Sequence, residues 1–287
     1  MVRGAVTDTL PKFKCLPGGF MLSRKCLLGL FFPLFVSGFV FAQHQDAKSP
    51  DRDPQSLEIL ARVVQAAGGS QVLAAVRDIT EKGEIEFHWG ESIKGPVTIQ
   101  MLGANHFRLD YEVPSRKSAL TVKDGFGFEQ SEGKARAISY IRAVNLGSLT
   151  FPVAHSVAAL ADPLTQVSSM DIERQNGRFV YRVRLAGRLG LVNDERSIRP
   201  VTKELIIDAL TYDIVSVEDQ PLSPVEKSNR ARSKVPQRQI EYGDFRQVNG
   251  VRLPFSIKVR VAGQRTMTIR LSQINFNSNL RDEDFGS

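Results

Sequence analysis

The chain has 287 residues, of which 42% are hydrophobic, and a formal net charge of +7 at pH 7. Residues 1–42 hold five basic residues and one acidic residue, so the 245 residues that follow carry a net charge of only +3. This small excess gives little support to a nucleic-acid partner. Both cysteines, Cys15 and Cys26, lie in the first 42 residues, so the remainder offers no disulfide and no thiolate for a metal or for catalysis.

Residues 1–42 predict an export signal. Arg24 and Lys25 precede an apolar run over residues 27–41, and Val40-Phe41-Ala42 has the small-x-small pattern of a signal-peptidase site. The apolar run is shorter than the roughly 20 residues that a membrane-spanning helix needs. We therefore expect translation to start at Met21 and cleavage to follow Ala42, with an uncleaved membrane anchor as the alternative.

After the expected cleavage site, residues 43–54 are polar and proline-containing, which predicts a disordered tether. A single domain is then expected over residues 55–287. Its first helix is predicted from apolar residues at helical spacing between Leu57 and Ala67, with Asp53 or Ser56 as the cap and Gly68-Gly69 as the end. A second short helix is predicted from Ser70.

Short strands with alternating apolar and polar residues follow, at intervals, from residue 84 to residue 217. They are not separated by regularly alternating helices, which disfavours a parallel sheet. Between Lys134 and Pro163 the spacing becomes helical, and two helices are predicted there, one from Ala137 to about Gly147 and one over Val153–Ala161.

The clearest pattern is an antiparallel meander over residues 237–276. Val251 to Val261 alternate strictly, so that one face of this strand is apolar and the other is polar. Asn249-Gly250 and Ala262-Gly263 provide turns of hairpin length. Such a sheet must cover its apolar face with helices or with a ligand. The loop 221–236, in contrast, is basic and lacks apolar periodicity.

No established catalytic motif is found in the sequence. The histidines have no metal-ligand spacing, so no metal site and no cofactor are expected. Asp208 and Asp213 flank a predicted hairpin turn, where a carboxylate more often binds backbone amides than acts as an acid or base. Asp208, Asp213 and His106 are weak candidates for catalytic residues, and we do not expect the protein to be an enzyme. The polar faces of the predicted strands carry Arg182, Arg184, Arg260 and Arg270. These arginines indicate either a solvated strand face or a basic patch for anionic head groups.

Large apolar side chains on one side of the predicted sheet are the main candidate for a binding site. They fit ordinary core packing or a ligand cavity of roughly 300–1,000 Å³. The residues assigned to this face are Phe87, Trp89, Phe107, Leu109, Phe126, Phe128, Phe179, Tyr181, Leu253 and Phe255.

Several features together resemble a known family. An exported chain starts with a helix ending in Gly-Gly, and the strand pair around residues 205–215 is followed by Tyr242-Gly243-Asp244-Phe245 and Asn249-Gly250-Val251. The chain closes with Ile274-Asn275-Phe276 and Asp284-Phe285. This pattern resembles the outer-membrane lipoprotein-sorting proteins of the LolA/LolB kind, with which RseB-like regulators are grouped.

The resemblance implies an α+β fold, mainly antiparallel, in which a strongly curved half-barrel sheet of about eleven strands is covered by a few short helices. It implies a monomeric periplasmic carrier that holds lipoprotein acyl chains or another lipid-like ligand without covalent bonds, makes transient membrane contact and needs no cofactor. The alternative is an RseB-like sensor that binds another envelope protein, with the loop 221–236 as its contact.

Overall fold

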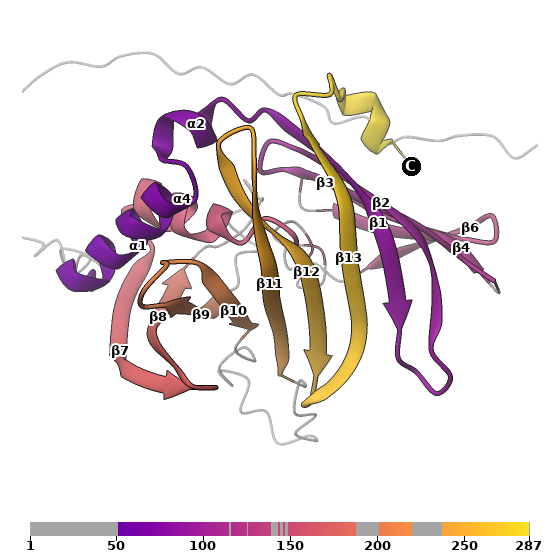
Figure 1. Ribbon diagram of the computed structural model, residues 1–287. Coiled ribbons are helices and arrows are strands. Elements are labelled where there is room, and N and C mark those ends of the chain that lie inside the picture. The colour runs from indigo at the N-terminus through magenta and orange to yellow at the C-terminus, as the bar shows by residue number, and fades with distance from the viewer. Residues whose placement is uncertain are drawn as a thin grey trace, which may run out of the picture. The chain divides into compact units, whose positions relative to one another are not determined.

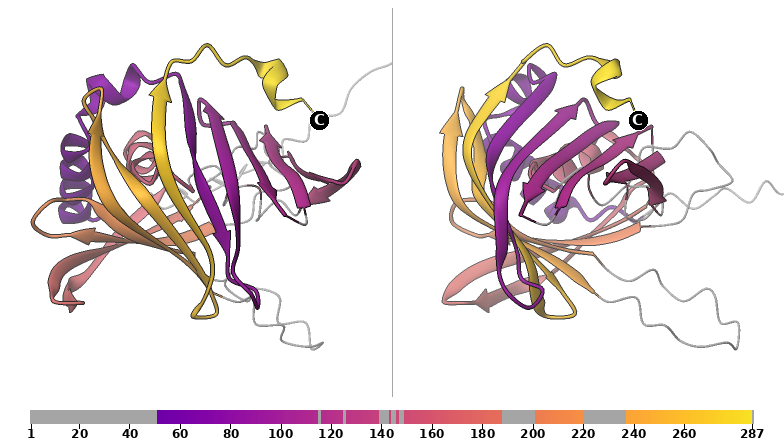
Figure 2. Two further views of the ribbon diagram at one scale, coloured as in Figure 1. Left: turned by 45° about the vertical axis from the view of Figure 1, so that its right-hand side comes forward. Right: turned by 90° about the vertical axis from the view of Figure 1, so that its right-hand side faces the viewer.

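The computed structural model describes residues 51–286 except 115, 125, 139–142, 144–145, 147–148, 188–200 and 220–236. The predicted signal segment, the tether up to residue 50 and the basic loop 221–236 therefore lie outside the described residues. The described part is dominated by a single sheet of 13 antiparallel strands, which bends strongly and does not close (Figures 1 and 2). This confirms the predicted fold class, although about eleven strands were expected.

The order of the strands follows from two runs of hairpins that meet at the first and last strands. The order is β6-β5-β4-β3-β2-β1-β13-β12-β11-β10-β9-β8-β7, so β6 and β7 are the two edges. The strands are β1 (Asp78–Phe87), β2 (Ile93–Leu102), β3 (His106–Val113), β4 (Arg116–Lys123), β5 (Phe126–Ser131), β6 (Lys134–Ile138), β7 (Gln166–Gln175), β8 (Arg178–Gly187), β9 (Val201–Asp208), β10 (Ile214–Asp219), β11 (Arg238–Val248), β12 (Val251–Val261) and β13 (Gln264–Phe276).

The predicted meander forms the central part of the sheet. Strands β11, β12 and β13 pair in succession, and β13 continues into the pairing with β1. Asn249 and Gly250 both have positive φ angles, 48° and 85°, which is the backbone of a tight hairpin turn. Along β12, Val251, Leu253 and Ile257 are buried, as their alternation predicts.

The apolar face of the sheet carries the core and is called the concave face here. It is the face of Ile85, Ile99, Leu205 and Ile257, all of which are fully buried. Helix α4 (Val153–Ala161) lies inside the curve of the sheet, and α1 (Pro54–Ala66) packs against α4 and β7 (Figure 2). The predicted cap of α1 is confirmed, because Ser56 N donates to Asp53 Oδ2 at 2.8 Å. The second predicted helix is α2 (Ser70–Ala74).

The segment after Lys134 departs from the prediction of a helix. Glu132 and Gly133 have φ angles of 52° and 74° and form a hairpin turn, so Lys134–Ile138 pairs with β5 as strand β6. The turn therefore overrides the helical spacing that begins at Ala137. Ala143 and Leu146 are helical, whereas Tyr140, Ile141 and Val144 lie outside the described residues.

The chain is fastened at both ends of the described part. Arg52 forms a parallel bridge with Val167 of β7, and its guanidinium donates to the carbonyl of Ala159 at 2.9 Å in α4. At the other end, the 3-10 helix η1 (Asp282–Phe285) buries Phe285 beside His106 of β3, with 5.3 Å between the ring centroids. No helix of the described part is long and apolar enough to cross a membrane.

Candidate functional site

The structure separates the ten predicted cavity residues into three groups. Phe107, Leu109, Leu253 and Phe255 are buried in the core. Phe87 and Tyr181 are partly buried and pack against it. Trp89, Phe126, Phe128 and Phe179 are exposed. The ten side chains therefore do not line one common space, and a ligand role for those on the concave face stays a prediction.

Phe126 and Phe128 lie on the opposite face of the sheet, which corrects their assignment. Gly127 pairs with Val122, whose side chain is fully buried on the concave face, so the two phenylalanines flanking Gly127 point away from it. A Cβ atom on Gly127 would lie 2.5 Å from Cγ1 of Ile138, so Ile138 occupies the place of a larger side chain. Choosing the large residues of this strand as the inner ones was therefore wrong.

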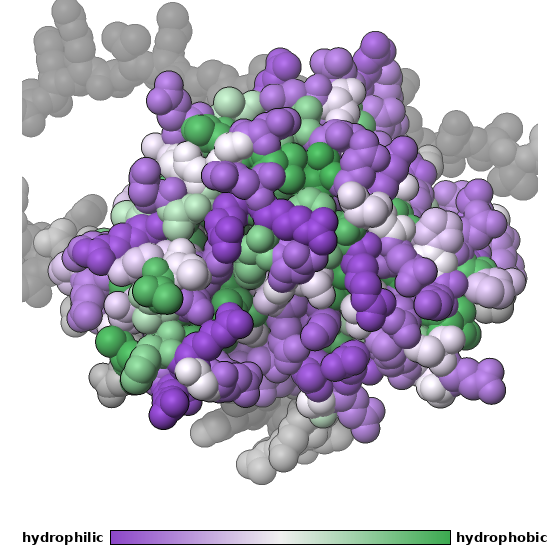
Figure 3. Space-filling model, in the orientation of Figure 1, coloured by the Kyte–Doolittle hydropathy of each residue, from purple (hydrophilic) through white to green (hydrophobic). Residues whose placement is uncertain are grey.

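A groove of about 840 Å³ lies at one end of the sheet, where β8, the β9–β10 turn and β11 come together. Its apolar lining includes Phe179, Leu210, Val215 and Phe245, and Phe179 and Leu210 are 63% and 88% exposed. Hydrophobic side chains gather over this end of the sheet, at the left of Figure 3. Isolated exposed apolar residues are common, but their concentration beside a groove is typical of a binding surface.

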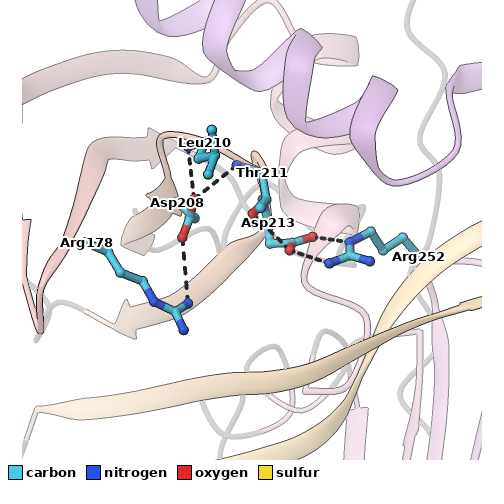
Figure 4. A network of polar contacts seen from close by, with 6 residues as sticks. All are labelled: Arg178, Asp208, Leu210, Thr211, Asp213 and Arg252. Carbon is cyan, nitrogen blue, oxygen red and sulfur yellow. Dashed lines mark hydrogen bonds and ion pairs between the residues drawn. The ribbon is translucent and has the colours of Figure 1, made fainter.

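Hydrogen bonds hold the β9–β10 turn in place (Figure 4). Asp208 Oδ1 accepts from the backbone amides of Leu210 at 2.9 Å and Thr211 at 3.0 Å, and Arg178 lies 3.6 Å from its other oxygen. Asp213 accepts two bonds from Arg252, at 2.8 and 2.9 Å. Asp208 thus binds backbone amides of the turn, as the sequence favoured, whereas Asp213 binds the side chains of Arg252 and Thr211, and Leu210 at the turn is exposed to solvent.

The ion pair between Asp213 and Arg252 also connects the groove to the helices. Arg252 N donates to the carbonyl of Ala67 at 3.0 Å, immediately after α1. Asp213, Phe245 and Arg252 line both the groove and a small gap of about 20 Å³ whose other walls include Val63 of α1 and Val153 of α4. The hydrogen bonds that Arg252 donates to Asp213 raise the pKa of Arg252. This ion pair separates the open groove from the contact between sheet and helices.

Asp208→Ala should lower the free energy of unfolding by about 1–3 kcal/mol, because two backbone amides of the turn lose their buried acceptor. Arg178→Ala should change it by less than about 0.5 kcal/mol, because that side chain is mostly exposed and its ion pair is long. Urea denaturation of the two variants measures the difference. Equal losses would mean that the ion pair, and not the amide bonds, holds the turn.

The predicted basic patch is largely neutralised by acidic neighbours. Arg182 is bound by Glu173 at 3.0 Å and Glu204 at 2.9 Å. Arg260 pairs with Glu241 at 2.7 Å, and Arg270 pairs with Glu86 at 3.0 Å. Arg184 is exposed. The arrangement corresponds to a solvated strand face and gives the anionic head-group hypothesis little support.

Several charged residues face inward, and they were not predicted from the sequence. Lys203 is buried on the concave face, where its Nζ lies 2.8 Å from Asp219 Oδ1 and Arg238 lies 2.5 Å from the other oxygen of Asp219. Burial lowers the pKa of nearby His155 to about 3. Glu81 is also buried on this face, and burial raises its pKa to about 7. Both Lys203 and Glu81 stand in alternating apolar rows, and extending those rows along the sequence would have revealed them.

His106 lies at the contact between β3 and η1. Its Nε2 atom lies 2.9 Å from Asp282 Oδ1, which fastens η1 to β3. Within the described ranges, no cluster of three or more histidine, cysteine or acidic side chains is arranged to hold a metal ion.

No protein-family model matches the sequence, and no curated protein matches it. Solved structures do resemble the fold. A LolA superfamily protein from Nitrosomonas europaea gives a TM-score of 0.53 at 12% identity, over 78% of this chain and 96% of that chain. An outer membrane lipoprotein-sorting protein domain from Vibrio parahaemolyticus gives 0.48 at 13% identity, over 81% and 96%. A DUF1329 family protein from Desulfovibrio piger gives 0.49 at 11% identity, over 82% and 98%.

The fold is therefore of the LolA kind, as the sequence pattern predicted. At such low identity the likeness concerns the fold and leaves the ligand to be argued from the site.

Proposed function

We propose that the exported chain, after cleavage behind Ala42, is a periplasmic protein that binds or carries an acyl chain or another lipid-like ligand without covalent bonds. The groove of about 840 Å³ is the observation that carries the proposal. It exposes Phe179 and Leu210 to solvent and adjoins the contact between the sheet and the helices α1 and α4. A ligand chain entering there would have to pass the Asp213–Arg252 ion pair to reach the concave face.

Burial of apolar area supplies the affinity in this proposal. Each Å² of apolar surface removed from water contributes about 25 cal/mol, so even part of an acyl chain is held firmly. The curved sheet provides a long apolar face, and α1 and α4 are attached to it through side-chain packing and a few hydrogen bonds, which include Arg252 N to the carbonyl of Ala67, Arg62 Nη1 to Tyr212 Oη and Asp53 N to the carbonyl of Val167. Movement of these helices away from the sheet would open the concave face to the ligand.

The test is mass spectrometry, under native conditions and after solvent extraction, of protein purified from a bacterial periplasm after expression of the full chain. We expect a stoichiometric lipid or acyl species. Phe179→Asp should lose most of it, because the charge opposes entry of an apolar chain. Phe126→Asp is the matched control, since Phe126 is similarly exposed at 68% but lies on the opposite face. Circular dichroism verifies that both variants fold.

Two outcomes would contradict the proposal. A protein that is free of lipid and ignores added acyl chains would mean that the concave face is ordinary core, and it would favour the RseB-like alternative of an envelope protein partner. Equal lipid loss in both phenylalanine variants would mean that the groove is not the entrance.

A further inference from the structure

Glu81 is a carboxylate in the middle of the concave face. It belongs to β1, where it is paired with Ile99 of β2 on one side and Ile274 of β13 on the other. Its side chain shares the face of these two buried residues and is 0% exposed. The position is therefore apolar, central in the sheet and closed to water.

Neither carboxyl oxygen of Glu81 has a hydrogen-bond partner. A hydrogen-bonding effect of the Thr150 hydroxyl partly offsets the rise in the pKa of Glu81, but the contact does not have ordinary hydrogen-bond geometry, and the hydroxyl also contacts Met101 Sδ at 4.0 Å. Among the carboxylates of the described part, Glu81 is the one whose two oxygens are both buried and unpaired. The buried carboxylates of Asp208 and Asp219, by contrast, have amide or cationic partners.

The fold gives no reason for a carboxylate at this position. A buried polar group without a partner destabilises the folded state, and an aliphatic side chain would pack there at no such cost. Native proteins satisfy nearly all of their buried polar groups, so an exception calls for an explanation, and a ligand that supplies the missing partner is one such explanation. A donor of hydrogen bonds would satisfy Glu81, whereas an anionic group would be repelled.

We propose that Glu81 binds the hydrogen-bond-donating head group, an ammonium or a hydroxyl, of an acyl ligand lying on the concave face. This inference rests on the proposed function and narrows its ligand class. It also agrees with the neutralised arginines of the outer face, which leave little to attract an anionic head group.

The surroundings of Glu81 permit a ligand to approach it. Thr150 precedes α4, and the backbone hydrogen bonds of this turn are local, from Leu149 to Leu146 and from Ala154 to Phe151. Among the described residues, no backbone hydrogen bond joins this turn to the strands. A head group can therefore take the place of Thr150 without breaking the sheet.

Calorimetric titration with dodecylamine, dodecanol and dodecanoic acid tests the proposal at pH 8, where Glu81 is mostly ionised. Because a hydrogen bond to a charged group is worth about 1.5–3 kcal/mol, the protein should bind the amine roughly tenfold or more tightly than the acid. The alcohol should lie between them. Glu81→Leu should abolish this preference while retaining the acid, and it should fold, since it removes an unpaired charge.

Glu84→Leu is the matched control, because Glu84 lies on the other face of the same strand and its loss should leave the preference unchanged. Equal binding of amine and acid by the unaltered protein would overturn the inference, and so would a preference that survives in Glu81→Leu. If none of the three compounds binds, the proposed function fails as well.

Discussion

Glu81→Leu should make the protein more stable, and the gain should be about 3 kcal/mol larger at pH 8 than at pH 4.5. The pKa of Glu81 rises from 4.5 to about 7 on folding, because burial disfavours the ionised carboxylate. Its contribution to stability is therefore fully present below pH 4.5 and is lost as the pH rises through 7. A shift of this size corresponds to about 3 kcal/mol, at 1.36 kcal/mol per pH unit. Urea denaturation at the two pH values measures it.

Glu86 provides a control of opposite sign on the same strand. Hydrogen bonds from Ser92 and Arg270 lower the pKa of Glu86 to about 2. Its contribution to stability is present above pH 4.5 and is lost as the pH falls toward 2, so Glu86→Gln should destabilise the protein more at pH 7 than at pH 3. A Glu81→Leu variant that is equally more stable at both pH values would show that the Glu81 carboxyl is hydrated or paired.

A stability gain in Glu81→Leu would matter for function as well. Residues that destabilise the fold are retained where a site needs them, and improved stability combined with lost ligand preference is the expected signature of such a residue. The denaturation experiment and the titration therefore test two separate properties of Glu81. The first asks whether Glu81 is buried and unpaired, and the second asks what pairs with it.

The fold was predictable where turn chemistry and alternation agree. Asn249-Gly250 and the alternating residues of β12 determine one register, and the structure has that register. The segment from Lys134 was mispredicted as a helix because the turn at Glu132-Gly133 leads it back along β5 as the edge strand β6. The pairing with β5 outweighs the local helical spacing. The pairing of β1 with β13 joins distant parts of the chain, and no local pattern specifies it.

The site was predictable only in part, because the inner face was read from large apolar side chains. That rule found Phe107 and Leu253, but it placed Phe126 inside, where the small Gly127 is the inward residue. It also passed over Glu81 and Lys203, since a charged side chain in an apolar row does not count toward an apolar face. Which groove remains open depends on how far the sheet curves, and the sequence of one strand does not determine that curvature.

Phe107→Ala should lower the free energy of unfolding by about 3–5 kcal/mol, whereas Phe126→Ala should change it by less than about 0.5 kcal/mol. Phe107 is 1% exposed and packs between the buried Met101 and Val122 on the neighbouring strands, so its removal leaves a cavity in the core. Phe126 is the same type of residue but is exposed to solvent, so its replacement by alanine leaves no cavity. Urea denaturation of the two variants at one pH provides the comparison. A small loss for Phe107→Ala would mean that the core collapses readily around this site. A large loss for Phe126→Ala would contradict the face assignment and return this phenylalanine to the interior.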